Sequence, residues 1–227
     1  MVTPSPTLPD WERLLAAERH VQHLVPGAVL VGGTAAAAHR RSIDGDHVLA
    51  DLRSRFDEVL GALEAAAGWR TERILPPVLI LGQMAEVLTG IRQLRRTEPL
   101  EVEQVDGLTI PRLAEMARIK GWLLATRCTV RDYLDTVVLC ERLGDAGTRA
   151  AFARFDSLYR QPTGASPLVG LVERLSAAEP VDVAGVDLAT YRGLVAPWTN
   201  WNHVVARRRA FAQALSQVAL APDKESP

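Results

Sequence analysis

Two aspartates separated by one residue, Asp44 and Asp46, are the side chains of this sequence best suited to bind a metal ion. Alternate residues of an extended strand point to the same side, so both carboxylates can reach one divalent cation. Gly32, Gly33 and Thr34 precede them, and glycine backbone N–H groups can closely approach a triphosphate. This combination predicts phosphoryl or nucleotidyl transfer.

Each half of the pattern also has an ordinary structural explanation. Two glycines between a strand and a helix often form only a turn, and an Asp-x-Asp sequence is common on solvated surfaces. The order strand, Gly-Gly-Thr, helix and Asp-x-Asp is more specific, because the phosphate-binding turn would face the metal-binding strand.

A second candidate cluster is basic and lies further along the chain. Residues 112–131 contain one acid, Glu115, and five basic residues, which are Arg112, Arg118, Lys120, Arg127 and Arg131. Lysine binds phosphate as a compact charge and arginine as a planar fork. A solvated helix face with scattered ion pairs is the alternative interpretation.

The elements that must position these groups follow from hydrophobic periodicity. Residues 11–24 and 53–67 predict amphipathic helices, and residues 28–31, 44–52, 78–81, 91–94 and 100–105 predict strands of one mixed sheet. Residues 111–126, 130–143, 148–159 and 201–218 predict helices. We therefore expect an α+β catalytic domain over residues 1–110 and a helical domain over residues 111–227.

Composition bounds the class of protein. Of the 227 residues, 48% are hydrophobic and 23% are charged, so the chain can bury a core. The net charge of -1 requires that any polyanion be bound by a local basic patch. The first ten residues lack the pattern of a signal peptide, and no apolar run approaches the roughly 18 residues of a membrane span. Cys128 and Cys140 do not form a zinc motif, so we expect two core cysteines and a cytoplasmic protein.

Several segments resemble the AbiEii/AbiGii-type nucleotidyltransferase toxin family. The resemblance is carried by residues 30–35 (LVGGTA), 39–46 (HRRSIDGD), 113–120 (LAEMARIK) and 131–135 (RDYLD). It implies a polymerase-beta-like nucleotidyltransferase fold with a small mixed sheet and a C-terminal helical bundle. Members are typically toxins of bacterial toxin–antitoxin (type IV, AbiE-like) or phage-defence pairs, and some add nucleotides to tRNA ends.

The resemblance also implies a cofactor, a substrate and partners. Mg²⁺ or Mn²⁺ would be the metal, an NTP the substrate, tRNA a possible acceptor and a protein encoded nearby the antitoxin. Asp44 and Asp46 would bind the metal while an acceptor hydroxyl attacks the α-phosphorus and pyrophosphate leaves.

The roles of individual residues follow by position. Gly32, Gly33, Thr34 and Ser42 would line the phosphate site, and Lys120 and Arg131 would contact the triphosphate. Asp132 would lie near the active centre, with Arg127 and Asp135 in support. A third carboxylate that activates the attacking hydroxyl would come from Glu103 or, as a second choice, Glu101, which share one face of their predicted strand.

Two residues depart from the family pattern, in which hydrophobic side chains lie between and after the aspartates. Here these positions are Gly45 and His47. The departure leaves open a degenerate, non-catalytic nucleotide-binding module. The acceptor is a separate question, and a protein or a small molecule, as for antibiotic-modifying enzymes of the same broad fold, is the alternative to tRNA.

Other conspicuous residues have more ordinary interpretations. His20, His39 and His47 lack zinc-ligand spacing. Trp198 and Trp201 are expected to pack against the bundle rather than stack on bases, whereas Arg207, Arg208 and Arg209 could bind RNA phosphate or simply face solvent.

Overall fold

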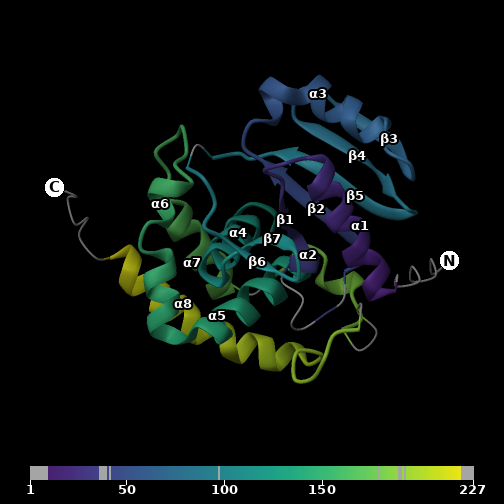
Figure 1. The fold of residues 1–227 in the computed structure, drawn as a ribbon. Helices are drawn as coiled ribbons and strands as arrows, with labels where there is room; N and C mark the ends of the chain where they lie inside the picture. The colour runs from purple at the N-terminus through teal and green to yellow at the C-terminus, as the bar shows by residue number, and fades with distance from the viewer. Residues whose placement is uncertain are drawn as a thin grey trace. The chain divides into compact units, whose positions relative to one another are not determined.

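The computed structural model describes residues 10–35, 40, 42–96, 98–177, 179–188, 191 and 193–220. Its contacts divide the chain into two units, Met1–Arg112 and Leu113–Pro227, and each is described by itself. The first combines strands with helices, and the second is helical (Figure 1). The protein thus has the predicted α+β class.

A five-stranded mixed sheet forms the framework of the first unit. Its strand order is β1-β2-β5-β4-β3, with β2 and β5 parallel and all other neighbours antiparallel. The strands are β1 (Val29–Val31), β2 (Asp44–Leu49), β3 (Trp69–Leu75), β4 (Leu79–Met84) and β5 (Val87–Gln93). The mixed sheet was predicted, but β3 was not.

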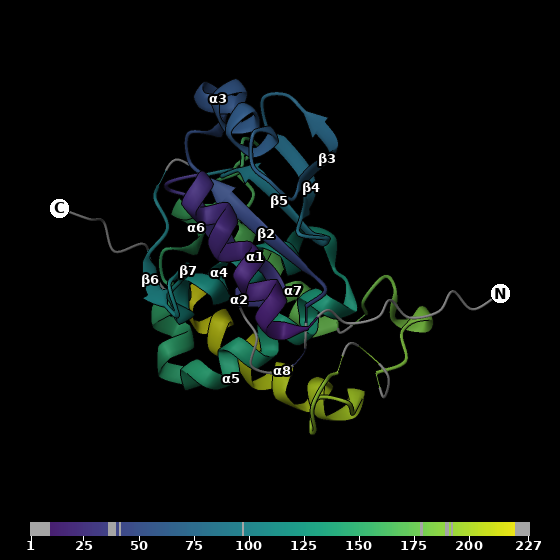
Figure 2. The ribbon, with the colours of Figure 1, turned by 45° about the vertical axis from the view of Figure 1, so that its right-hand side comes forward.

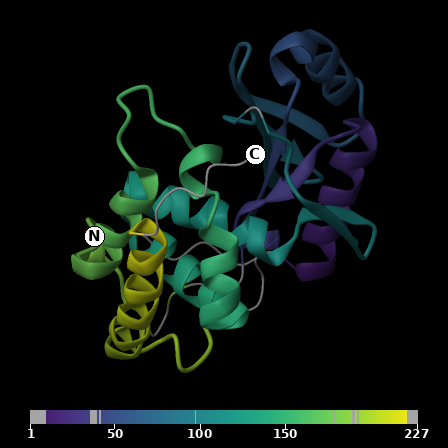
Figure 3. The ribbon, with the colours of Figure 1, turned by 90° about the vertical axis from the view of Figure 1, so that its left-hand side faces the viewer.

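Two amphipathic helices cover one face of this sheet. Helix α1 (Trp11–Leu24) begins where the Asp10 side chain accepts a hydrogen bond from the Arg13 N–H, and α3 (Leu52–Glu64) follows β2. Both contribute to one apolar core with β4 and β5, in which Leu14, Leu63 and Ile91 are fully buried. Figure 2 shows α1 crossing in front of the strands, and Figure 3 shows both helices on one side of the sheet. A short helix, α2 (Gly32–Ala35), follows β1.

The prediction that residues 100–105 belong to the main sheet was wrong. They contain β6 (Val102–Val105), which pairs only with β7 (Leu108–Pro111) in a separate two-stranded sheet. Asp106 and Gly107, both with positive φ, form the two-residue connection that a tight hairpin requires. This local turn pairs β6 with the next strand along the chain.

Helices make up the second unit. They are α4 (Leu113–Arg127), α5 (Val130–Phe152), α6 (Phe155–Leu158), α7 (Pro167–Ala177), the 3₁₀ helix Val183–Gly185 and α8 (Trp201–Ala219). Helix α5 continues past its predicted end through an irregular residue, Gly144, and α7 was not predicted. Cys128 and Cys140 are both buried and free, as expected. Among the described residues, no helix is both long and apolar enough to span a membrane.

The two faces of β5 should differ sharply in their contribution to stability. Ile91 is fully buried under α1 and α3, whereas Leu88 is 42% exposed on the other face. Ile91→Ala should lower the free energy of unfolding by about 2–5 kcal/mol because it leaves a cavity. Leu88→Ala should cost under about 1 kcal/mol. Urea denaturation of both variants measures the difference, and equal losses would contradict the assigned faces.

Candidate active site

Asp44 and Asp46 occupy one face of β2. Along this strand, partly exposed residues alternate with buried ones, so Asp44 and Asp46 share the open face while Gly45 and His47 face the interior. This is the arrangement that a cation shared by the two carboxylates requires.

The predicted phosphate turn lies against the beginning of this strand. The Thr34 hydroxyl donates a 2.7 Å hydrogen bond to the Asp44 carbonyl, and the Ser42 hydroxyl lies 3.0 Å from both the Asp44 carbonyl and Asp44 Oδ1. Gly32 has φ +82°, and a Cβ atom there would lie 3.5 Å from Asp46 Oδ2. The structure therefore brings Gly32, Thr34, Ser42 and the aspartate pair together.

Two arginines without a predicted role lie beside these groups. Arg92, on β5, places Nε 3.4 Å from Asp46 Oδ1, and both side chains are partly exposed. The guanidinium group of Arg40, a buried residue, lies beside Gly33, with Nη1 2.7 Å from the position that a Cβ atom at Gly33 would take. Both arginines bring positive charge to the turn and the carboxylates. Sequence spacing gives no indication of the Arg92 contact, because it depends on the pairing of β2 with β5.

A carboxyl group, Glu18 of α1, lies on the buried side of β2. Glu18, His47 and Thr89 are all buried there. The Thr89 hydroxyl donates a 2.9 Å hydrogen bond to Glu18 Oε2, which also lies 3.4 Å from His47 Nδ1. The sequence did contain an indication of Glu18, because it falls in the apolar stripe with Leu14 and Val21.

Burial sets the charge of this interior cluster. Burial is the main reason that the pKa of Glu18 is raised to about 8, and the negative charges of Asp46 and Asp44 also raise it. The hydrogen bond from Thr89 acts in the opposite direction and lowers this pKa. Burial also lowers the pKa of His47 to about 3. Near pH 7 the carboxyl group is therefore mainly protonated and the imidazole is neutral, which avoids burying two isolated charges.

The donor set at Asp44 and Asp46 fits magnesium. Mg²⁺ is usually bound by one or two carboxylates, with substrate phosphates and water completing six oxygen ligands. Among the described residues, no group of three or more His, Cys, Asp or Glu side chains could hold a metal by itself. Two carboxylates beside the predicted phosphate turn match a metal that arrives with a nucleotide.

The two candidates for a third carboxylate lie outside the main sheet. Glu103 is exposed on β6, where it pairs with Ile110, and Glu101 immediately precedes that strand. Neither belongs to a strand paired with β2. The β6–β7 hairpin, rather than the sheet that carries Asp44 and Asp46, positions both residues.

Lys120 and Asp135 form an ion pair inside the second unit. Lys120 Nζ lies 2.7 Å from Asp135 Oδ2, and the two side chains are 3% and 0% exposed. They join α4 to α5. A charged pair this deeply buried depends on both partners, because removal of one leaves an uncompensated charge.

Asp132 stabilises the beginning of α5. The Thr129 hydroxyl donates a 2.7 Å hydrogen bond to Asp132 Oδ2, while Thr129 Oγ1 accepts a bond from the Asp132 N–H. Thr129 is thus the N-cap of α5, and Asp132 orients its hydroxyl group. Arg127 Nη2 lies 3.2 Å from Asp132 Oδ1. Arg131, between them, is partly exposed.

The conspicuous residues near the C-terminus mostly serve packing. Trp198 is buried, and Trp201 packs edge-on against Tyr133. Arg208 is buried and donates to the carbonyl groups of Leu175 and Ser176 at the end of α7. Arg207 pairs with Glu141, whereas Arg209 is exposed. Of the three histidines considered, His39 lies outside the described residues and His20 is exposed.

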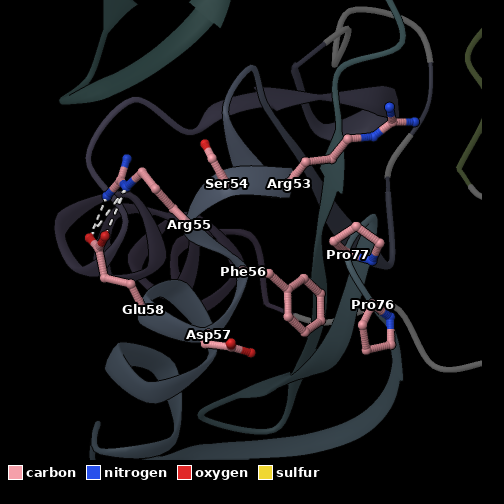
Figure 4. A pocket seen from close by; sticks show the side chains of 8 residues that line it. All are labelled: Arg53, Ser54, Arg55, Phe56, Asp57, Glu58, Pro76 and Pro77. Atoms are coloured by element: carbon pink, nitrogen blue, oxygen red, sulfur yellow. Dashed lines mark hydrogen bonds and ion pairs between the residues drawn. The ribbon is translucent and has the colours of Figure 1, made fainter.

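The detected cavities do not contain the candidate residues. One, of about 320 Å³, lies between Pro76 and Pro77 and the beginning of α3, including Arg53 and Phe56 (Figure 4). Another, in the second unit, is bordered by Arg208, Arg209 and Gln213.

Comparison with known proteins identifies the fold. No protein-family model and no curated protein matches the chain. A "putative nucleotidyltransferase from H. pylori" has a solved structure that is 15% identical with a TM-score of 0.54, covering 91% of this chain and 93% of its own. JHP933 from Helicobacter pylori is 15% identical with a TM-score of 0.55, covering 93% and 94%. The chain thus has the α+β nucleotidyltransferase fold.

Removal of one member of the buried ion pair should destabilise the second unit. Lys120→Ala leaves Asp135 buried without its partner and should cost about 3–5 kcal/mol, whereas Lys120→Met with Asp135→Leu should recover most of that loss. The control is Arg207→Ala, because the pair of Arg207 with Glu141 is 38% exposed on both sides and should be worth under about 1 kcal/mol. Thermal and urea unfolding measure all three, and a harmless Lys120→Ala would contradict the buried pair.

Glu18 should make stability depend on pH. Its pKa is about 8 in the folded protein against 4.5 ordinarily, so its stabilising effect is complete below pH 4.5 and is lost as the pH rises to 8. Glu18→Gln removes this titration. The stability of the variant relative to wild type should therefore increase by about 1.4 kcal/mol per pH unit across that interval. A constant difference in urea midpoints would disprove the raised pKa.

Proposed function

We propose that this chain is a magnesium-dependent nucleotidyltransferase that transfers NMP from an NTP to an acceptor hydroxyl. The observation that carries the proposal is the placement of Asp44 and Asp46 on one face of β2, beside the turn formed by Gly32, Gly33 and Thr34. The fold shared with a structure described as that of a "putative nucleotidyltransferase" supports it.

The residues at this site would have separate roles in binding the metal, orienting its ligands and contacting the phosphates. Asp44 and Asp46 would hold Mg²⁺, which when bound would neutralise phosphate charge and align the triphosphate for in-line attack. Ser42 orients the Asp44 carboxylate through its 3.0 Å hydrogen bond. The backbone at Gly32 and Gly33 would approach the phosphates, and Arg40 and Arg92 would supply positive charge as pyrophosphate leaves.

Lys120 and Asp132 are proposed to complete the site, as the resemblance implies. The Lys120 ammonium group already has a carboxylate partner, Asp135. Contact between Lys120 and the triphosphate would therefore require this pair to open or to share the lysine with phosphate. We propose that Arg131, which is partly exposed one residue before Asp132, also contacts phosphate.

The biological role is proposed from the resemblance to AbiEii/AbiGii-type toxins. The chain would be the toxin of a bacterial toxin–antitoxin or phage-defence pair, act in the cytoplasm, modify tRNA ends and be neutralised by a protein encoded nearby. A protein or a small molecule is the alternative acceptor. A degenerate module that only binds nucleotides is the non-enzymatic alternative. It was suggested by the departure of Gly45 from the family pattern, but Gly45 makes room for Glu18 in the interior and the aspartate pair is kept.

Label transfer tests the enzymatic proposal. Wild-type protein incubated with each α-³²P-labelled NTP, Mg²⁺ and total RNA should label an acceptor. Asp44→Asn and Asp46→Asn should each lower the rate by about 100-fold or more, the effect of removing one electrostatic contact to a transition state. Asp57→Ala is the matched control, since Asp57 is exposed on α3, and it should match wild type.

Separate acceptor reactions distinguish the alternatives. Purified tRNA, added protein and aminoglycoside are tested in parallel, and transfer to one of them identifies the acceptor class. Nucleotide binding without transfer to any acceptor would favour the degenerate module. Equal transfer by the Asp44 and Asp46 variants would show that these carboxylates are not catalytic.

Induced expression tests the toxin role. Wild-type protein should arrest bacterial growth and Asp46→Asn should not, with both accumulating to the same level. Co-expression of the neighbouring gene should restore growth. Unaffected growth on wild-type expression would contradict the toxin role without affecting the label-transfer result.

A further inference from the structure

Glu18 is an unusual residue for its position in α1. It lies in the apolar stripe formed by Leu14, Ala17 and Val21, and it is fully buried. An uncharged apolar side chain would avoid the cost of removing a carboxyl group from water. The local environment must therefore explain why a carboxyl group lies there.

Gly45 provides the space that Glu18 occupies. A Cβ atom built at Gly45 would lie 2.1 Å from Glu18 Cδ and 2.2 Å from each carboxyl oxygen. No side chain at residue 45 can coexist with Glu18 in this position. The carboxyl group thus takes the place of the side chain that residue 45 lacks, directly between the backbone positions of Asp44 and Asp46.

Glu18 also connects the two central parallel strands. Thr89 on β5 is the register partner of Gly45 on β2, and its hydroxyl donates to Glu18 Oε2 at 2.9 Å. His47 Nδ1, one step further along β2, lies 3.4 Å from the same oxygen. One carboxyl group therefore contacts β2 and β5 at the level of the aspartate pair.

We infer that Glu18 is a positioning residue of the proposed active site, holding the segment of β2 that presents Asp44 and Asp46 by filling the space at Gly45 and bonding to Thr89. The inference rests on the proposed function. It also explains both departures from the family pattern, because Gly45 makes room for the carboxyl group and His47 adds a polar neighbour to it. The hydrophobic side chains of the family pattern would be replaced here by a side chain from α1.

Four variants at this contact test the inference. Glu18→Ala leaves β2 unsupported and should weaken Mn²⁺ binding, measured by electron paramagnetic resonance with Mn²⁺ alone, by about 10–100-fold. Glu18→Gln keeps the shape and the acceptor for Thr89, so its affinity should stay within about 3-fold of wild type. Adding Gly45→Ala to Glu18→Ala puts a Cβ atom into the vacated space and should recover part of the loss. Gly45→Ala alone should force the Glu18 carboxyl group out of this space and weaken Mn²⁺ binding as Glu18→Ala does.

A matched control separates positioning from general stability. Leu14→Ala removes a fully buried side chain one turn earlier in the same stripe and should lower stability by about 2–5 kcal/mol. At a temperature where it is folded, its Mn²⁺ affinity and its KM for Mg²⁺ in label transfer should equal those of wild type. If Glu18→Ala does not fold, Thr89→Val replaces it, because this change removes the hydrogen bond and keeps the volume.

The outcomes distinguish the inference from the proposed function. Wild-type protein that is folded but neither binds Mn²⁺ nor transfers label would refute the proposed function, and the inference with it. Active wild-type protein together with folded Glu18→Ala or Thr89→Val whose Mn²⁺ affinity and KM for Mg²⁺ are unchanged would overturn the inference alone. The inference would be supported if Mn²⁺ binding is weakened in Glu18→Ala or Thr89→Val but stays close to that of wild type in Glu18→Gln and Leu14→Ala.

Discussion

The two-residue period of a single strand, β2, governs the chemistry of the first unit. It places Asp44 and Asp46 on the open face and turns Gly45 and His47 inward, so the same six residues form both a candidate metal site and part of the core. Because the strand has no freedom to rotate one residue without its neighbours, whatever packs beneath Gly45 also affects the position of the carboxylates above it.

Charge is distributed unevenly around this strand. Three acidic side chains, Glu18, Asp44 and Asp46, lie within electrostatic range of one another, and burial together with the two aspartates raises the pKa of Glu18 to about 8. On the open face, Arg92 pairs with Asp46, whereas the buried Arg40 lies beside Gly33. Interior protonation and surface pairing thus limit the repulsion that a cluster of carboxylates would otherwise produce.

Residues of the second unit for which the sequence predicts catalytic roles also have structural partners. Lys120 pairs with Asp135 between α4 and α5, and Asp132 accepts a hydrogen bond from Thr129, the N-cap residue of α5. Loss of activity on mutating these residues would therefore combine effects on folding and on chemistry. Asp44 and Asp46 are better suited to isosteric substitution because both are partly exposed.

The sequence by itself determined the features that depend on local periodicity and on turn chemistry: α1, the glycine turn, the strand with Asp44 and Asp46 on one face, and a mixed sheet followed by helices. Only the tertiary structure decided that β6 pairs with β7 alone, that Arg92 meets Asp46, and that Glu18 fills the space at Gly45. These contacts join residues far apart in the chain, and their partners are selected by strand order and helix packing. A sequence pattern that repeats every two or four residues does not indicate which distant residues will be in contact.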